Sequence, residues 1–129
     1  MTSLSIGRRL SLLLALLASS SLASAQQDPP ILNAYVSADG SYDEMLVTVV
    51  EVVMTPRADG RGFDTSSREL MYEQPMRYQG QGVWTTSLPI PGGPTAPPAG
   101  GSVFRTISVK AKRDGQTFTG FSGGSYWTQ

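Results

Sequence analysis

Residues 45–55 of the chain read MLVTVVEVVMT, a stretch in which valine and threonine predominate and only Glu51 is charged. β-Branched side chains favour an extended backbone, because they pack well on a pleated surface. Apolar residues occupy both alternating sets of positions, which is typical of a strand with both faces buried. We therefore predict a central strand here, ended by Pro56, whose missing N–H cannot continue the hydrogen-bond ladder.

The most specific pattern lies nearer the C-terminus, where residues 103–120 read VFRTISVKAKRDGQTFTG. The first ten of these residues alternate between an apolar and a polar set. Asp114-Gly115 suits a two-residue type I′ turn, because both central residues of that turn need a positive φ. With this turn Ala111 pairs with Phe118, so we predict that Phe118 lies on the apolar face and in the core.

Shorter runs of strand-forming residues predict further strands at 31–38, 69–73, 76–79 and 83–88, the last carrying Trp84 into the core. The segments 57–67 and 89–101 have no period and are rich in charge, glycine or proline, so we expect loops there. No stretch of the chain beyond its first 25 residues has a helical period. The pattern predicts an all-β fold, an antiparallel sandwich of about seven strands.

The first 25 residues have the three parts of a cleavable signal peptide. Arg8 and Arg9 provide the positive end, residues 10–18 (LSLLLALLA) a short apolar core, and Ala23-Ser24-Ala25 a cleavage site. Cleavage would leave residues 26–129 as a single domain. We expect export to the periplasm or the cell surface, by the general secretory rather than the twin-arginine route. No later segment is long enough to span a membrane, so no membrane insertion is expected after cleavage.

Composition limits the chemistry available to the exported domain. The chain has no histidine and no cysteine, so it can form neither a serine–histidine or cysteine–histidine nucleophile system nor the usual zinc sites. Glycine-rich phosphate-binding motifs are absent as well. The ten basic residues do not outnumber the ten acidic ones, which argues against nucleic-acid binding. We expect a protein that is not an enzyme and has no cofactor.

One turn contains several oxygen ligands in alternation: Asp39, Ser41, Asp43 and Glu44. This spacing resembles the start of a calcium loop, although Glu44 stands at the sixth position, where such loops need glycine. An ordinary polar turn explains the same residues. Weak calcium binding is the alternative, and it would raise the melting temperature when calcium is added.

The exposed aromatic residues are the candidate binding site. In the predicted register Phe104 and Phe121 share the outer face of the last hairpin, and Tyr126-Trp127 follows just beyond them. Exposed apolar groups that cluster mark a partner site, and aromatic residues are favoured there. The alternative is that Tyr126 and Trp127 fold back and cover the two phenylalanines.

Four segments together resemble a bacterial immunoglobulin-like or fibronectin type III-like domain. They are DPPI (28–31), VTVVEV (47–52), GVWTTSLP (82–89) and ISVKAKRDG (107–115), similar to the first, second, core-aromatic and final strands of such modules. The chain departs from antibody domains in lacking their cysteine pair. The resemblance implies a sandwich fold and a binding or spacing role, and it implies no catalytic residue.

We therefore expect an exported, non-enzymatic module that binds another protein of the cell envelope or the extracellular space. A carbohydrate-binding module, with Tyr126, Trp127, Tyr72 or Tyr78 as stacking platforms, is the alternative. A structural subunit that adds a strand to a neighbouring sheet is a third possibility.

Overall fold

The computed structural model describes residues 29–120 and 123–129, and within them the fold is all-β. The predicted signal peptide, residues 1–25, and Phe121 lie outside the described residues. The strands are β1 (Ile31–Ser37), β2 (Glu44–Pro56), β3 (Phe63–Pro75), β4 (Arg77–Gly80), β5 (Val83–Pro89), β6 (Ser102–Arg113), β7 (Gln116–Gly120) and β8 (Gly124–Thr128). The described residues contain no helix with the length and apolarity needed to cross a membrane.

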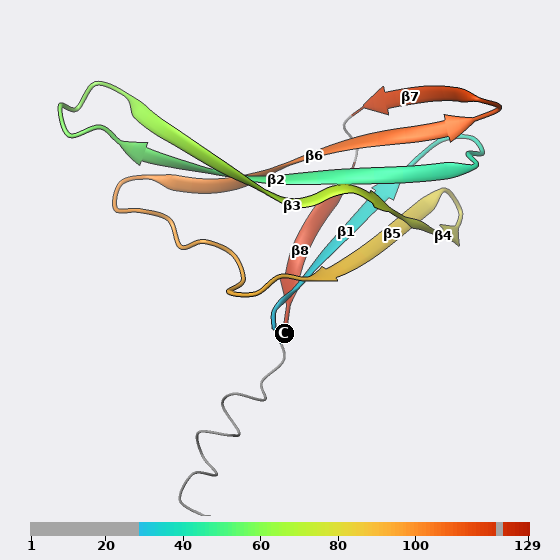
Figure 1. The fold of residues 1–129 in the computed structure, drawn as a ribbon, viewed down its shortest axis with the longest axis horizontal. Coiled ribbons are helices and arrows are strands. Elements are labelled where there is room, and N and C mark those ends of the chain that lie inside the picture. The colour runs from blue at the N-terminus through green and yellow to red at the C-terminus, as the bar shows by residue number, and fades with distance from the viewer. Residues whose placement is uncertain (1–28, 121–122) are drawn as a thin grey trace, which may run out of the picture.

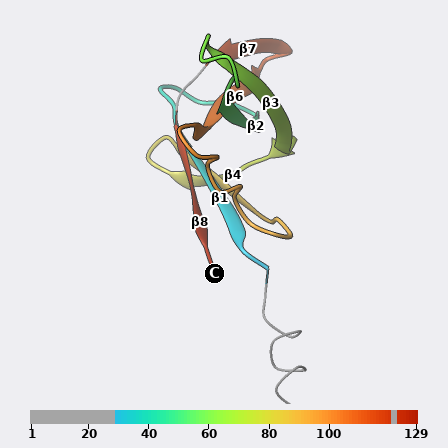
Figure 2. The ribbon, with the colours of Figure 1, turned by 90° about the vertical axis from the view of Figure 1, so that its left-hand side faces the viewer.

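Two antiparallel sheets of four strands pack face to face, which confirms the predicted sandwich class (Figures 1 and 2). The first sheet has the order β4-β5-β1-β8, and the second has the order β3-β2-β6-β7. Alternate residues from both sheets form one core between the layers. Its buried apolar members are Leu32, Ala34, Val36, Met45, Val47, Val49, Leu70, Met71, Met76, Trp84, Val109 and Ala111.

The valine-rich strand β2 is central in its sheet, as predicted, with β3 on one side and β6 on the other. Its inward residues Met45, Val47 and Val49 are almost completely buried. The prediction that both faces are buried is wrong, because the outward residues, among them Val50 and Val52, are only half-buried. Within residues 29–120 and 123–129, no element packs on this outer face.

The register of the last hairpin, β6–β7, matches the prediction, with Ala111 opposite Phe118. Asp114 and Gly115 both have positive φ, at 51° and 78°, as a type I′ turn requires. The prediction that Phe118 is buried is wrong, because its side chain is 38% exposed. Phe118 points to the inner face, but β7 is an edge strand of its sheet, and the described strands of the other sheet make few contacts with it.

Strand β8 is an element that the sequence pattern did not predict. It pairs antiparallel with β1, and Ile31 lies opposite Thr128, so the start of the first strand and the end of the last strand are neighbours. This pairing makes β1 the centre of its sheet, between β5 and β8.

The segment predicted as a loop at 57–67 is shorter in the structure, since β3 begins at Phe63. β2 and β3 are each 13 residues long, and their distal halves form an arm that extends past the first sheet (Figure 1). All residues from Phe63 to Glu69 are exposed, and this explains why they carry no apolar alternation. The proline-rich segment between β5 and β6 is irregular, as predicted.

Candidate functional site

The predicted aromatic residues do not share one surface. Phe104, on β6, points outward from the second sheet and is 45% exposed. Trp127, on β8, lies opposite Leu32 and packs against the core between the sheets. Tyr126 points the other way, to the outer face of the first sheet, and is 52% exposed. Adjacent residues of a strand point to opposite faces, which separates Tyr126 from Trp127.

Phe104 belongs to an apolar surface that sequence reasoning did not find. It lies opposite Val52 of β2, and the neighbouring outward residues of β2 are Val50 and Met54. We call these four residues the outer-face patch. They are flanked on β3 and β6 by uncharged hydroxyl residues: Thr65, Ser67, Ser102 and Thr106. The exception is Val50, whose partner on β3 is the exposed residue Glu69. Further along the sheet Lys110 pairs with Glu73 and Lys112 with Glu44.

The outer-face patch is unusual for a face that no described element covers. A sheet with one wet face normally alternates apolar and polar residues along each strand. Here the central strand β2 carries valine and methionine on its outward side as well. This apolar content is the signal that produced the prediction of burial on both faces.

A second feature lies on the inner face of the second sheet, where the proline-rich segment meets β2 and β3. Glu51 of β2 is inward-facing and only 1% exposed. Its carboxylate accepts hydrogen bonds from Arg68 Nε at 2.9 Å, from the Thr95 backbone N–H at 3.1 Å and from the Thr95 hydroxyl. Arg68 also donates to the Gly93 carbonyl at 2.8 Å. Together these bonds connect the proline-rich segment to β2 and β3 of the second sheet.

The electrostatics of Glu51 follow from these contacts. Burial by itself raises the pKa of Glu51, because the charged form loses water. The hydrogen bonds from Thr95 and Arg68, together with the charge of Arg68, outweigh burial and leave that pKa below its ordinary value. Glu51 is therefore a buried anion at neutral pH, held by its partners.

Beside this ion pair lies a cavity of about 310 Å³. Its wall includes Glu51, Pro94, Thr95, Pro97, Val103, Phe104, Arg105 and Trp127. Two of the predicted aromatic residues, Phe104 and Trp127, thus line the same cavity although they point to different faces of the fold. The guanidinium carbon of Arg105 lies 5.9 Å from the centroid of the Trp127 ring, within the range of a cation–π contact.

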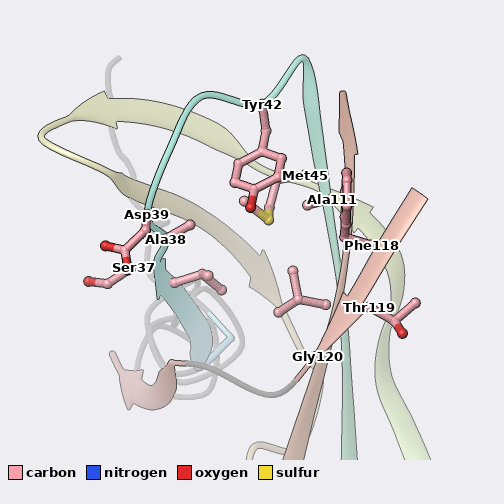
Figure 3. A pocket seen from close by; sticks show the side chains of 11 residues that line it. Ser37, Ala38, Asp39, Tyr42, Met45, Ala111, Phe118, Thr119 and Gly120 are labelled. Carbon is pink, nitrogen blue, oxygen red and sulfur yellow. The ribbon is translucent and has the colours of Figure 1, made fainter. Parts of the chain in front are cut away.

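Another concave region opens between the end of β1 and the edge strand β7, with a volume of about 340 Å³ (Figure 3). Its apolar lining includes Tyr42, Met45 and Phe118. Tyr42 and Phe118 meet edge to face, and the Arg113 guanidinium lies 5.2 Å from each ring centroid. These contacts explain why Phe118 is no more than partly exposed, since an aromatic ring and a guanidinium cover part of it in place of a second sheet.

The outer face of the first sheet carries a different group of side chains. Tyr35 and Tyr126 lie side by side there, with ring centroids 6.4 Å apart. The Tyr35 ring covers Gly124, where a Cβ would come within 2.5 Å of the Tyr35 hydroxyl. Asn33, directly opposite Tyr126 in the ladder between β1 and β8, accepts a hydrogen bond from Ser87 and donates to Thr128. This face combines two exposed rings with amide and hydroxyl groups.

The other candidate platforms lie elsewhere. Tyr72 is exposed on β3, in the second sheet. Tyr78, on β4, packs against Trp84 at 5.1 Å between ring centroids, and its hydroxyl accepts a hydrogen bond from the Gly82 N–H. Neither residue joins Tyr126 in one surface, because β3 belongs to the other sheet and β4 is separated from β8 by two strands.

The residues of the candidate calcium turn have separate surroundings. Asp43 accepts a hydrogen bond from the Asp114 N–H at 3.0 Å, and Glu44 pairs with Lys112 at 3.4 Å. Asp39 and Ser41 line two different concave regions. In the described part of the chain, acidic side chains do not gather in threes or more where they could hold a metal ion.

Comparison of the chain with models of known families, with curated proteins and with solved structures finds no match.

Proposed function

We propose that the chain is an exported, non-enzymatic, immunoglobulin-like module that binds another protein of the cell envelope through the outer-face patch. The observation that carries this proposal is the apolar, uncharged outer face of β2 and β6 around Val52 and Phe104. Contiguous exposed apolar groups on a folded domain mark interaction sites. Hydroxyl residues border Val52 and Met54 on β3 and β6, so this part of the patch can be desolvated without burying a charge.

The strand order supports the immunoglobulin-like part of the proposal. Immunoglobulin domains have the strand order A-B-E-D in one sheet and C-F-G in the other, which variable-type domains extend beyond strand C. The orders β8-β1-β5-β4 and β3-β2-β6-β7 correspond to this arrangement if β8 takes the place of the first strand. The chain would then be an immunoglobulin-like fold in which the last strand fills the position that usually belongs to the first.

Export is part of the proposal because the N-terminal 25 residues have the pattern of a signal peptide. A domain without cysteine has no disulfide to add to the stability of its packed core. The periplasm and the cell surface are both consistent with that pattern.

Envelope cross-linking tests the protein-binding proposal. The tagged domain, expressed in its own host and cross-linked in living cells, should capture a partner in stoichiometric amount. With that partner, Val52→Lys or Phe104→Ser should weaken binding at least about tenfold, because truncating a central apolar contact costs more than about 1.4 kcal/mol.

The matched controls carry the same changes on the other sheet. Thr85→Lys and Tyr126→Ser lie on its outer face, at half-buried and exposed positions respectively, and should leave binding unchanged. Equal binding by the patch variants and the wild type would refute the assignment of the site. Absence of any captured protein would count against a protein partner altogether.

A second function, glycan binding, is favoured by the Tyr35–Tyr126 pair and the polar groups beside it. Flat exposed rings next to amide and hydroxyl groups suit the apolar and polar sides of a sugar. If this reading holds, the domain is retained on an insoluble envelope polysaccharide and released by soluble sugar. Tyr126→Ser should abolish retention and Phe104→Ser should not. The reverse pattern would contradict glycan binding at this face.

A further inference from the structure

Arg105 is a half-buried cation without an anionic partner among the described residues. Its Nη1 is buried and has no hydrogen-bond acceptor there. A buried guanidinium donor without an acceptor costs free energy, and such atoms in a folded protein call for an explanation. The guanidinium of Arg105 lies over the face of the Trp127 ring. The ring face cannot accept the hydrogen bonds that the guanidinium N–H groups donate in the plane of the guanidinium.

The acidic residue opposite Arg105 does not neutralise it. Glu51 lies directly opposite it in the ladder between β2 and β6. Its carboxylate, however, is bonded to Arg68 and Thr95 and forms no ion pair with Arg105. Arg68, Glu51 and Arg105 together therefore leave one uncompensated positive charge at this end of the interlayer space.

The cavity beside Arg105 has the character of a small-ligand site. Its volume of about 310 Å³ is at the lower end of the range of about 300–1,000 Å³ for ligand pockets. Pro94, Pro97 and Val103 provide apolar walls. The Trp127 ring supports the guanidinium of Arg105 from one side. Trp127 Nε1 and Arg105 Nη1 have almost no accessible surface, so a ligand would bond the other N–H groups of the guanidinium. The hydrogen bonds between Glu51 and Thr95 hold the proline-rich wall in position before any ligand arrives.

We propose that this cavity binds the carboxylate of a ligand, with the guanidinium of Arg105 as its anion-binding group. A planar carboxylate matches the fork of a guanidinium. Glu51 in the wall disfavours a dianion such as phosphate, because a second negative charge would be repelled at close range. The apolar walls favour a monocarboxylate that carries a ring or a short apolar group. This site is separate from the outer-face patch, although Phe104 borders both.

The carboxylate could belong to a free acid or to the C-terminus of a peptide, and the test separates these sources. Benzoate, its uncharged analogue benzamide, and a short peptide ending in phenylalanine, as the free acid and as the amide, are titrated into the exported domain. Calorimetry and the fluorescence of the two tryptophans report binding. We expect benzoate to bind at least tenfold more tightly than benzamide. If the peptide acid binds at least tenfold more tightly than benzoate while its amide does not bind, the source is a protein terminus.

The variant Arg105→Gln should lose at least tenfold in benzoate affinity, and Arg61→Gln, at the tip of the arm, should lose none. Thermal unfolding checks that both variants are folded. Equal binding of benzoate and benzamide to the wild type would overturn the proposal without reference to any variant. The proposal would also be overturned if neither benzoate nor the peptide acid bound at 10 mM. It would equally be overturned if folded Arg105→Gln bound benzoate as tightly as the wild type, since the expected tenfold loss corresponds to about 1.4 kcal/mol.

Discussion

Replacing Trp84 with alanine is expected to lower the free energy of unfolding by about 3–5 kcal/mol, the usual cost of deleting a large aromatic side chain from a core. Trp84 is 8% exposed and lies opposite Val36 of β1, on the inner face of the first sheet. Its ring packs against Tyr78 of the neighbouring edge strand. The change therefore leaves a cavity between the layers and removes the surface on which β4 packs.

The loss is large for a domain of this size, whose total stability is of the order of 5–15 kcal/mol. Urea unfolding followed by fluorescence measures this loss of stability. Trp127 is the only other tryptophan in the chain, so in the variant it is the single tryptophan that reports unfolding. Trp84→Phe is the matched control and should lose much less, since it keeps a ring in the same place. A loss below about 1 kcal/mol in Trp84→Ala would mean that the ring is not packed as described.

The second large effect is expected at Arg68. Arg68→Met removes the cation from a carboxylate that stays buried, and breaking one side of such a pair costs about 3–5 kcal/mol. Arg68 is itself 44% exposed, so we expect a value near the lower end, about 3 kcal/mol at pH 7. The double variant Glu51→Gln/Arg68→Met should recover part of this loss, because no unpaired charge is left in the interior. If the loss of unfolding free energy in the double variant equals the sum of the losses in the two single variants, the pairing is contradicted.

The pH dependence provides an independent check on the same pair. In the wild type the pKa of Glu51 is lowered on folding, because the hydrogen bonds from Thr95 and Arg68 outweigh burial. Its contribution to stability is therefore present above the ordinary pKa of 4.5 and is lost as the pH falls through the lower folded value. A protonated Glu51 needs no cation, so the difference in stability between the wild type and Arg68→Met should shrink in acid. A difference that is constant from pH 7 to pH 3 would contradict this account.

The local parts of the fold were predictable from sequence because neighbouring residues determine them. The hairpin β6–β7 is an example, since the turn at Asp114-Gly115 and the alternation before it specify the pairing of Ala111 with Phe118. The alternation also predicted that Phe104 is exposed. The burial of Phe118 was predicted wrongly. The alternation along the strand determines to which face of the sheet Phe118 points, but whether another layer covers that face depends on distant parts of the chain.

Elements that depend on distant partners were not predictable in the same way. β8 is a short strand, and its partner within residues 29–120 and 123–129 is β1, about 90 residues earlier in the chain. A pairing between segments so far apart has no signal in the residues next to either strand. The pairing of Glu51 with Arg68, and of both with the proline-rich segment, likewise joins residues from separate elements. The cavity at Arg105 exists only because these elements meet there.

The sequence by itself determined that the chain forms strands and turns, which strand is central, and which chemistries its composition excludes, because these depend on side-chain type and on periods of two residues. Only the tertiary structure decided which faces remain open. A strand that is apolar on both sides, such as β2, can be covered by a second layer of its own chain or by another molecule, and its sequence is the same in both cases. The order of the strands and the number of layers settle this, and they leave Val50, Val52, Met54 and Phe104 without a described neighbour above them.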